Sequence, residues 1–279
     1  MTQQYAPQGF RILPTGVKHL IIINTLFFLA TKVLQYSLNV DLYSYLALYY
    51  VDCELFRPWQ FVTHLFMHGN LMHLFLNMFA LWMFGNILEN LWGTKRFLFY
   101  FFVCGIGAGL VTTLTTWITS SIVLADINAF AAAPSPEGLM RVCARHFRGF
   151  YDPAMLEEAV TNWRNNPEAT NLGYEYTEEL MKMYERFTIG IRNVGASGAT
   201  YGILLAFAMY FPNERIYFYF LVPMKVKWFV IGFIIVEFLT GISGMHDFIG
   251  HFAHLGGMLF GLLLVLLWRK RDRMNRWQG

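Results

Sequence analysis

Long apolar runs recur along this chain, and they constrain its fold more than any other feature. Several contain about 18 or more mostly apolar residues, enough for an α-helix to cross the hydrocarbon core of a bilayer. The composition agrees, because 56% of the residues are hydrophobic and only 14% are charged. A soluble domain carries about a quarter charged residues. The sequence therefore predicts an all-α membrane protein that crosses the bilayer several times.

The runs divide the chain into six expected transmembrane helices and the segments between them. We place the helices at roughly 17–38, 68–92, 97–119, 195–211, 226–243 and 248–268. The first run is long enough to span and remain in the membrane, so we expect no cleavable signal before it. The expected divisions are a tail at 1–16, helices within 17–119, an insertion at 120–191, helices within 192–268 and a basic tail at 269–279.

Lysine and arginine are distributed unequally between the two sides of this arrangement. An even number of helices puts both termini on one side. The basic residues of that side are Arg11, Lys18, Lys95, Arg96, Arg215, Lys225, Lys227 and those of the tail RKRDRMNR. The opposite short loops hold only Arg57, with Lys32 near the end of the first helix. Because Lys and Arg favour cytoplasmic loops, we expect a multi-pass protein of the cell (inner) membrane with both termini in the cytoplasm.

Residues 120–191 break the apolar pattern, because they contain most of the acidic residues and have the composition of a soluble protein. The stretch DPAMLEEAVTNWRNN begins with an Asp-Pro helix start and has one apolar face, and TEELMKMYERF repeats this pattern. A segment of this length is translocated largely regardless of its charge. We interpret it as a long extracytoplasmic insertion with two amphipathic helices between the third and fourth transmembrane helices.

Other features of the composition exclude several functional classes. The three cysteines, Cys53, Cys104 and Cys143, form no close pair and are odd in number, so we expect neither a disulfide framework nor a thiolate metal site. The net charge of +3 is too small to indicate a nucleic acid partner. We expect no cofactor and a lipid bilayer as partner, and the composition says nothing about the oligomeric state.

Polar side chains gather near the outer ends of three expected helices, where they should face a cavity or a partner helix. They are His64, His68, His73 and Asn77 on the second helix, Ser197 on the fourth, and His251 and His254 on the last. About 14 or 15 residues, or roughly 21–22 Å, separate Ser197, His254 and Asn77 from the cytoplasmic ends of their helices. We therefore expect these three groups to meet at one depth, with His73 one turn further out.

Small residues should let two of these helices touch. Gly257 and Gly261 follow His254 on its helical face as a GxxxG pattern, which favours a close neighbour. The fourth helix begins GASGATYG and is the natural partner. This juxtaposition places Ser197 beside His254, which as a neutral imidazole can take the serine proton. Tyr201, one turn below Ser197, can pack against the imidazole ring.

Attack by Ser197 on a peptide carbonyl would create an oxyanion that needs hydrogen-bond donors already in place. The backbone N–H of Ser197 and the side chains of His73 and Asn77 fit this need, because the two side chains are four residues apart on one face. We expect no carboxylate beside His254, since Asp247 lies about 10 Å away along the helix. The expected unit is a Ser-His dyad.

These elements resemble those of the rhomboid intramembrane serine proteases. The family elements GxSG, AHxxG and HxxxN read here as GASG with Gly195, Ser197 and Gly198, as AHLGG with His254, and as His73 to Asn77 preceded by His68. The resemblance covers all six expected helices and implies a bacterial-type rhomboid bundle. It implies a catalytic dyad of Ser197 and His254, an oxyanion hole at His73 and Asn77, and supporting roles for the remaining residues, Tyr201, His68, Gly195 and Gly198.

The resemblance also implies the substrate, a transmembrane segment of another single-pass or polytopic membrane protein. This segment would enter past the fifth helix and the 244–250 loop and be cleaved through an acyl-enzyme. Segments that unwind easily should be favoured, because helical peptide bonds are shielded. One departure is Trp59-Gln60, where the family often carries Trp-Arg. We expect it to affect the anchoring of that loop and not catalysis.

Simpler interpretations remain for each polar residue. Ser197 could be a helix-packing residue, and His64, His68, His251 and His254 could bind zinc as two spaced pairs. Outside the proposed site, histidines are expected to be structural or to hold water. Glu237 is expected to be protonated or hydrogen-bonded between helices. Glu89 is expected to have a structural partner, either Arg96 or a loop amide.

Two other functional classes compete with the enzyme. A non-catalytic rhomboid-like protein would bind transmembrane clients without cleaving them, but such relatives typically lack the serine or the histidine, and both Ser197 and His254 are present. A transporter would show inverted repeats or paired broken helices, and the sequence shows neither.

Overall fold

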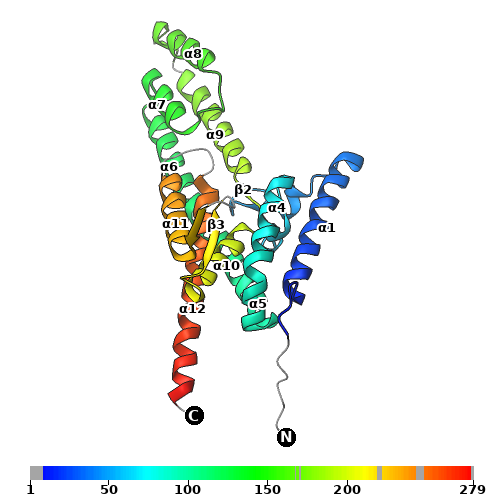
Figure 1. Ribbon diagram of the computed structural model, residues 1–279. Coiled ribbons are helices and arrows are strands. Elements are labelled where there is room, and N and C mark those ends of the chain that lie inside the picture. Colours follow the sequence, from blue (N-terminus) through cyan, green and yellow to red (C-terminus); the bar gives the residue numbers. More distant parts are fainter. Residues whose placement is uncertain (1–8, 167, 170, 219–221, 243–247, 278–279) are drawn as a thin grey trace. The chain divides into compact units, whose positions relative to one another are not determined.

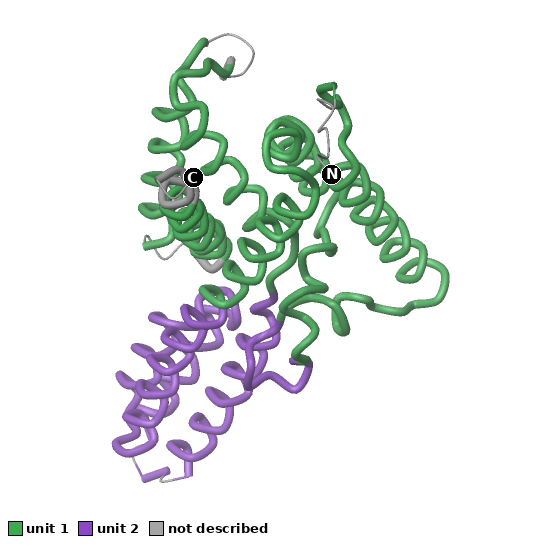
Figure 2. The backbone as a smooth tube through the Cα atoms, turned by 90° about the horizontal axis from the view of Figure 1, so that it is seen from below, with its two compact units in different colours: residues 1–48, 57–112, 193–279 green, residues 49–56, 113–192 purple. Residues whose placement is uncertain are grey.

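The structure is a computed structural model that describes residues 9–166, 168–169, 171–218, 222–242 and 248–277. The described residues are largely helical, and their strands are two to four residues long. The chain forms two compact units. One contains residues 1–48, 57–112 and 193–279, and the other contains residues 49–56 and 113–192 (Figure 2).

The first unit is a helical bundle with one β-hairpin (Figure 1). Its helices are α1 (Thr15–Leu38), α2 (Tyr43–Leu46), α3 (Gln60–Thr63), the 3₁₀ helix η1 (His64–Phe66), α4 (Leu71–Ala80), the π-helical turn η2 (Leu81–Gly85), α5 (Asn86–Trp92), the first part of α6 (Thr94–Ala132), α10 (Ser197–Tyr210), α11 (Val226–Ile242) and α12 (Phe248–Trp277). The hairpin pairs β3 (Arg215–Phe218) with β4 (Val222–Lys225) in antiparallel fashion. Two short strands, β1 (Leu48–Tyr49) and β2 (Arg192–Asn193), lie at boundaries between the two units.

Four helical segments of the described chain are long and apolar enough to cross a bilayer. They are Thr15–Leu38, Leu71–Trp92, Thr94–Ala132 and Gly250–Arg271, each at an expected position. The other two expected positions hold α10, which has 14 residues, and α11, which has 17. Because 14 residues rise only about 21 Å, α10 is shorter than a hydrocarbon core of about 30 Å. The protein is thus a multi-pass, all-α membrane protein, and four helices of its described residues have full spanning length.

The expected end of the third helix is wrong. The predicted helix 97–119 is part of α6, which continues to Ala132, so the expected insertion boundary at residue 120 falls inside a helix. The helix continues because Val123 and Ile127 go on burying an apolar face beyond the membrane-length run. Proline breaks helices, and the next proline is at position 134.

Two further helix ends differ from the expectation. The second transmembrane helix begins at Leu71, not at residue 68, because the side chain of Asn70 caps it by accepting a hydrogen bond from the His73 backbone N–H at 2.8 Å. The last helix continues past residue 268 to Trp277. Its charged residues are good helix formers, so the helix extends into the basic tail that was predicted to be separate.

The second unit contains the rest of α6 and three amphipathic helices, α7 (Pro136–His146), α8 (Pro153–Asn165) and α9 (Leu172–Gly190). Their apolar faces share a core that includes Phe130, Phe147 and Trp163. The sequence predicted α8 and α9 but missed α7. Its signal is Ser135 before Pro136, because the serine hydroxyl accepts a hydrogen bond from the Gly138 N–H at 3.1 Å.

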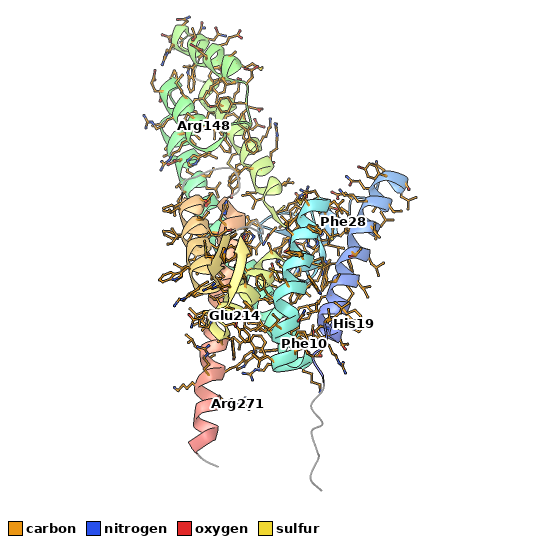
Figure 3. All side chains as sticks on the ribbon, in the orientation of Figure 1. Phe10, His19, Phe28, Arg148, Glu214 and Arg271 are labelled. Atoms are coloured by element: carbon orange, nitrogen blue, oxygen red, sulfur yellow. The ribbon has the colours of Figure 1, made fainter. Side chains whose placement is uncertain are left out.

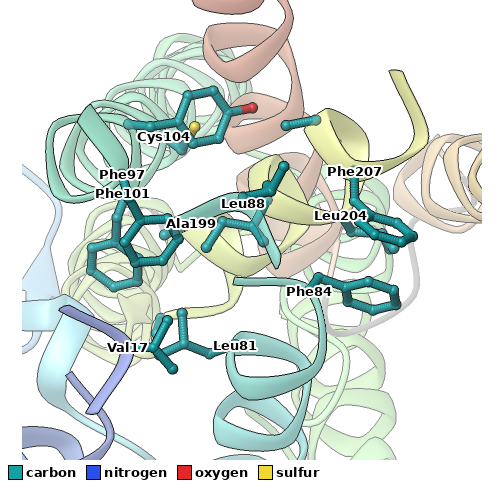
Figure 4. Packing of buried hydrophobic residues seen from close by; sticks show 14 of the residues in the cluster. Val17, Leu81, Phe84, Leu88, Phe97, Phe101, Cys104, Ala199, Leu204 and Phe207 are labelled. Atoms are coloured by element: carbon teal, nitrogen blue, oxygen red, sulfur yellow. The ribbon is translucent and has the colours of Figure 1, made fainter. Parts of the chain in front are cut away.

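The core of the first unit holds α10 against its neighbours. Phe84 of η2 faces Phe207 of α10 with ring centroids 5.0 Å apart, and Ala199 and Leu204 of α10 lie in the same cluster (Figure 4). The predicted contact between α10 and α12 is present. A Cβ added to Gly257 would overlap the carbonyl of Gly198, so the two backbones approach as closely as glycine allows.

A buried carboxylate joins the start of α1 to the end of α5. Glu89 accepts hydrogen bonds from the backbone N–H groups of Gly16 and Val17, both at 2.7 Å. A helix N-terminus favours a negative charge, so this contact stabilises the α1 start. Of the two predicted partners the backbone amides are confirmed, while Arg96 lies over the Trp268 ring at 4.0 Å.

Candidate active site

Ser197 is the first residue of α10 and is partly exposed. The backbone N–H groups of a helix's first turn have no acceptor within the helix, so they are available to a ligand. The chain enters this turn through Gly195, whose φ of +115° favours glycine. The Gly195 N–H donates to the His64 carbonyl at 2.9 Å, which fixes the approach to Ser197.

His254 lies on α12 against Tyr201 of α10. Their rings are stacked, with centroids 4.0 Å apart and planes 5° apart, as expected from the sequence. This contact restricts rotation of the imidazole and leaves its side chain 21% exposed. The hydroxyl of Tyr201 extends beyond the stacked rings and donates to Glu237 on α11 at 2.9 Å.

His73 and Asn77 lie on α4, and each is held by neighbouring groups. A Cβ added to Gly195 would lie 2.7 Å from the His73 ring, so glycine lets this ring approach the backbone just before Ser197. The amide of Asn77 donates to the His73 carbonyl at 2.8 Å and accepts from the Thr200 hydroxyl at 3.3 Å. Because a carbonyl can only accept, the bond to His73 fixes which amide atom of Asn77 is the donor.

One cavity brings the four predicted residues together. Ser197, His254, His73 and Asn77 all line a space of about 1100 Å³ between α4, η2, α10, α11 and α12. Most other lining residues are apolar: Leu76, Phe79, Ala80, Met83, Phe84, Ile87, Leu204, Phe207, Phe211, Ile216, Phe229 and Phe233. At the far end the lining includes Glu214, in the turn that follows α10 (Figure 3). The cavity is thus polar at Ser197 and mostly apolar along its length, with the charged residues Glu214 and Arg215 just beyond the end of α10.

His64 and His68 are buried beside this site and outside the membrane-spanning segments. The Nδ1–H of His64 donates to the Gln60 carbonyl at 2.7 Å, and burial lowers its pKa to about 4. Burial also lowers the pKa of His68 to about 3, and neither of its ring nitrogens has a hydrogen-bond partner among the described residues. Its ring lies edge-on to His73, with centroids 5.1 Å apart. Both histidines are therefore neutral at physiological pH.

Gln60, the departure from the family pattern, is fully buried. Its Nε2 donates to the Tyr45 carbonyl at 3.4 Å, a long hydrogen bond. The neighbouring Trp59 donates to the same carbonyl at 3.0 Å. The loop before α4 is thus anchored through backbone contacts despite the absence of arginine.

The expectation that no carboxylate lies beside His254 is wrong. Glu237 of α11 places Oε2 3.2 Å from Nδ1 of His254 and 2.6 Å from Nδ1 of His251. Asp247 is distant along the helix of His254, whereas Glu237 approaches from the neighbouring helix α11. Asp247 itself and residues 244–247 of the expected entry loop lie outside the described residues.

The side chains around Glu237 are also of types that bind metal ions. Glu237, His251 and His254 bring their ligand atoms within 4.8 Å of one another. Among the described residues, these three side chains form a cluster that could hold a metal ion. The zinc site considered from the sequence was a different set, the four histidines His64, His68, His251 and His254. His64 and His68 are not part of this cluster, and the His68 ring lies beside that of His73.

Two contacts of this site were not predicted from the sequence. Thr200 was not recognised as a partner of Asn77, although it lies one turn after Ser197 on the same helix. Glu237 was recognised as an unusual intramembrane carboxylate and predicted to be protonated or hydrogen-bonded between helices. The hydrogen bonds are present. Its partners on α10 and α12 could not be predicted, because the sequence does not specify how the three helices are rotated about their axes.

Comparisons with known proteins agree with this architecture. The family model described as Rhomboid domain matches residues 55–124 and 171–271, which together make up more than half of the chain. An uncharacterized mitochondrial rhomboid protein of Schizosaccharomyces pombe is 26% identical over 224 residues, covering 77% of this chain and 53% of the relative. The chloroplastic Rhomboid-like protein 11 of Arabidopsis thaliana is 27% identical over 188 residues, covering 67% of this chain and 56% of the relative. The chain thus spans about half the length of these curated relatives. Because the family model matches more than half of its residues, the chain belongs to the rhomboid family.

Proposed function

We propose that this chain is an intramembrane serine endopeptidase that cleaves transmembrane segments of other membrane proteins. The observation that carries the proposal is the shared cavity, in which Ser197 and His254 lie together with His73 and Asn77. A nucleophile, a base and two polar side chains from three separate helices converge there. A merely structural serine would need none of the other three.

In the first step Ser197 Oγ attacks the scissile carbonyl carbon while its proton passes to His254. Nδ1 of His254 lies beside Glu237, so Nε2 is the nitrogen assigned to accept the proton. The carbonyl oxygen becomes an oxyanion. The N–H of Ser197 and the side chains of His73 and Asn77 supply donors for it, which is the role that preorganised donors serve in acyl transfer.

In the second step the C–N bond breaks and His254 returns the proton to the leaving amine. The carbonyl carbon is then bound to Ser197 as an ester. Water attacks this ester, His254 takes the proton of the water, and the same proton finally restores the serine hydroxyl. The buried histidines His64 and His68 do not enter these transfers.

The apolar wall supports a transmembrane segment as substrate. Leu76 and Phe79 of α4 line the cavity and are also exposed on the bundle surface, at 56% and 36%. Phe229 and Phe233 of α11 line the opposite side. An apolar segment entering between α4 and α11 would exchange lipid contacts for these side chains, and only its unwound part would meet Ser197.

We further propose that both termini face the cytoplasm and that the second unit lies on the outer side of a cell membrane. The Lys/Arg distribution supports this orientation. It places Ser197 near the outer surface, where water can reach it. The basic end of α12, with Arg271, would then lie in the cytoplasm (Figure 3).

Cleavage of a model substrate tests the function. Wild type, Ser197→Ala, His254→Ala and the double variant are reconstituted into liposomes with a single-span protein whose transmembrane segment contains glycine. Members of a catalytic unit are not additive, so all three variants should lose cleavage to a similar degree. Cleavage by Ser197→Ala would reject the mechanism. Binding of the substrate without cleavage by the wild type would indicate the client-binding class.

A further inference from the structure

Glu237 is a buried carboxylate on α11, a helix whose other buried residues are the uncharged Val226, Val230 and Gly241. Its side chain is 7% exposed, while the flanking residues Ile235, Val236, Phe238 and Leu239 are about half exposed or more. An ionisable residue inside a membrane is costly unless it has partners. Glu237 has partners on two other helices, and both lie at the candidate active site.

The two oxygens of this carboxylate are held differently. Oε1 accepts from the Tyr201 hydroxyl at 2.9 Å, and Oε2 accepts from the Nδ1–H of His251 at 2.6 Å. These two bonds fix the position of the carboxylate. The titratable groups that face it among the described residues are Tyr201 of α10 and His251 and His254 of α12.

His254 is the third neighbour, and its contact with the carboxylate is looser. Nδ1 of His254 lies 3.2 Å from Oε2, within ion-pair distance, but it makes no aligned hydrogen bond. His251 occupies the same oxygen at the shorter distance. The contact to His254 therefore has room to strengthen when that ring gains a proton and becomes a cation.

We propose that Glu237 is a positioning residue for His254, which extends the expected dyad to a Ser197–His254–Glu237 triad. The carboxylate keeps the Nδ1–H of His254 directed toward α11, so that Nε2 is free to accept the proton of Ser197. It then stabilises the imidazolium that forms as Ser197 attacks. No proton passes to Glu237. The inference rests on the proposed function and adds a residue from α11 to it.

Labelling kinetics separate this role from a structural one. A fluorophosphonate reacts with an activated serine, and its concentration dependence gives a maximal rate, kinact, and an affinity, KI. In Glu237→Gln the amide keeps the size of the side chain and removes the charge. We expect kinact to fall about 10–100-fold, the range for a hydrogen bond to a charged group, with KI changed less than about twofold. Glu158→Gln, an exposed change on α8, is the matched control and should leave both unchanged.

The outcomes distinguish the two proposals. A wild type that is not labelled removes the proposed function and this inference with it. A labelled wild type with an equal kinact in Glu237→Gln removes only the inference, as does a change confined to KI or to the melting temperature. If Glu237→Gln does not fold, Glu237→Asp keeps the charge but withdraws it by one methylene. It should likewise lower kinact at constant KI, and an unchanged kinact would overturn the positioning role of Glu237.

A chelator arm tests the other chemistry of this cluster. Glu237, His251 and His254 are also zinc-ligand types. The positioning role of Glu237 needs no metal, so labelling of the wild type should be the same with and without EDTA. Loss of labelling in EDTA that zinc restores would show that the cluster binds a metal, and it would overturn the positioning role.

Discussion

Tyr201 and His254 lie face to face across the contact between α10 and α12, with ring centroids 4.0 Å apart. The same tyrosine donates its hydroxyl to Glu237, so one side chain contacts the proposed base and the carboxylate beside it. The position of the imidazole thus depends on a stacked ring as well as on charge.

The two functions of Tyr201 can be separated. Tyr201→Phe keeps the ring and removes the hydroxyl, whereas Tyr201→Leu removes the aromatic face as well. A stacked aromatic pair contributes about 0.5–1.5 kcal/mol, so Tyr201→Leu should lower kcat about 2–10-fold further than Tyr201→Phe does. Steady-state cleavage in liposomes measures both. Equal rates in the two variants would show that stacking does not position the base.

His73 and Asn77 are expected to stabilise the oxyanion. Removal of one preorganised donor typically costs about 10²–10³-fold in rate, so His73→Ala and Asn77→Ala should each cleave slowly while Ser197 still reacts with a fluorophosphonate. Thr200→Val removes one contact of the Asn77 amide and leaves its bond to the His73 carbonyl, so it should cost less than removal of the amide itself. Undiminished turnover in both alanine variants would refute the assignment.

Gly195 is expected to be required for activity more than for stability. Alanine there would need a φ of +115° and would place its Cβ 2.7 Å from the His73 ring. Gly195→Ala should therefore displace His73 and reduce turnover at least tenfold, an estimate based on the loss of one donor. Gly232→Ala on α11 is the control, because a Cβ there meets nothing within 4 Å. Equal activity of the two variants would contradict the close approach.

The orientation in the membrane predicts which side each segment occupies. The three native cysteines are buried, so an introduced cysteine reports with little background. In intact cells, Glu157→Cys on α8 should react with a membrane-impermeant maleimide. Arg271→Cys at the end of α12 should react only after the membrane is opened. The reverse pattern would invert the proposed topology.

The sequence predicted the convergence of the site because short motifs lie at equal depths on separate helices. Ser197, His254 and Asn77 each lie about 14 or 15 residues from the cytoplasmic helix end expected from the sequence, and the helical rise then gives them a shared depth, although α12 itself continues to Trp277. The close packing of α10 on α12 was predictable for a similar reason, since glycine spacing marks a helix face.

Contacts that depend on helix rotation were less accessible. Glu237 is a single carboxylate on α11, and only the packed bundle turns it toward His254. The length of α6 was not predicted because its apolar residues continue beyond the length needed to cross the membrane. The additional residues belong to the hydrophobic core of the second unit. The start of α7 was missed because its short amphipathic pattern follows a proline-rich stretch and was assigned to the insertion as a whole.

The central claim is that Ser197 is an activated nucleophile, and covalent labelling tests it most directly. The purified wild type in detergent is treated with a fluorophosphonate, and the modified peptide is identified by mass spectrometry. We predict modification at Ser197, none in Ser197→Ala and a far slower reaction in His254→Ala, which retains the serine but not its base. A wild type that remains unmodified, or modification that persists in Ser197→Ala, would contradict the account.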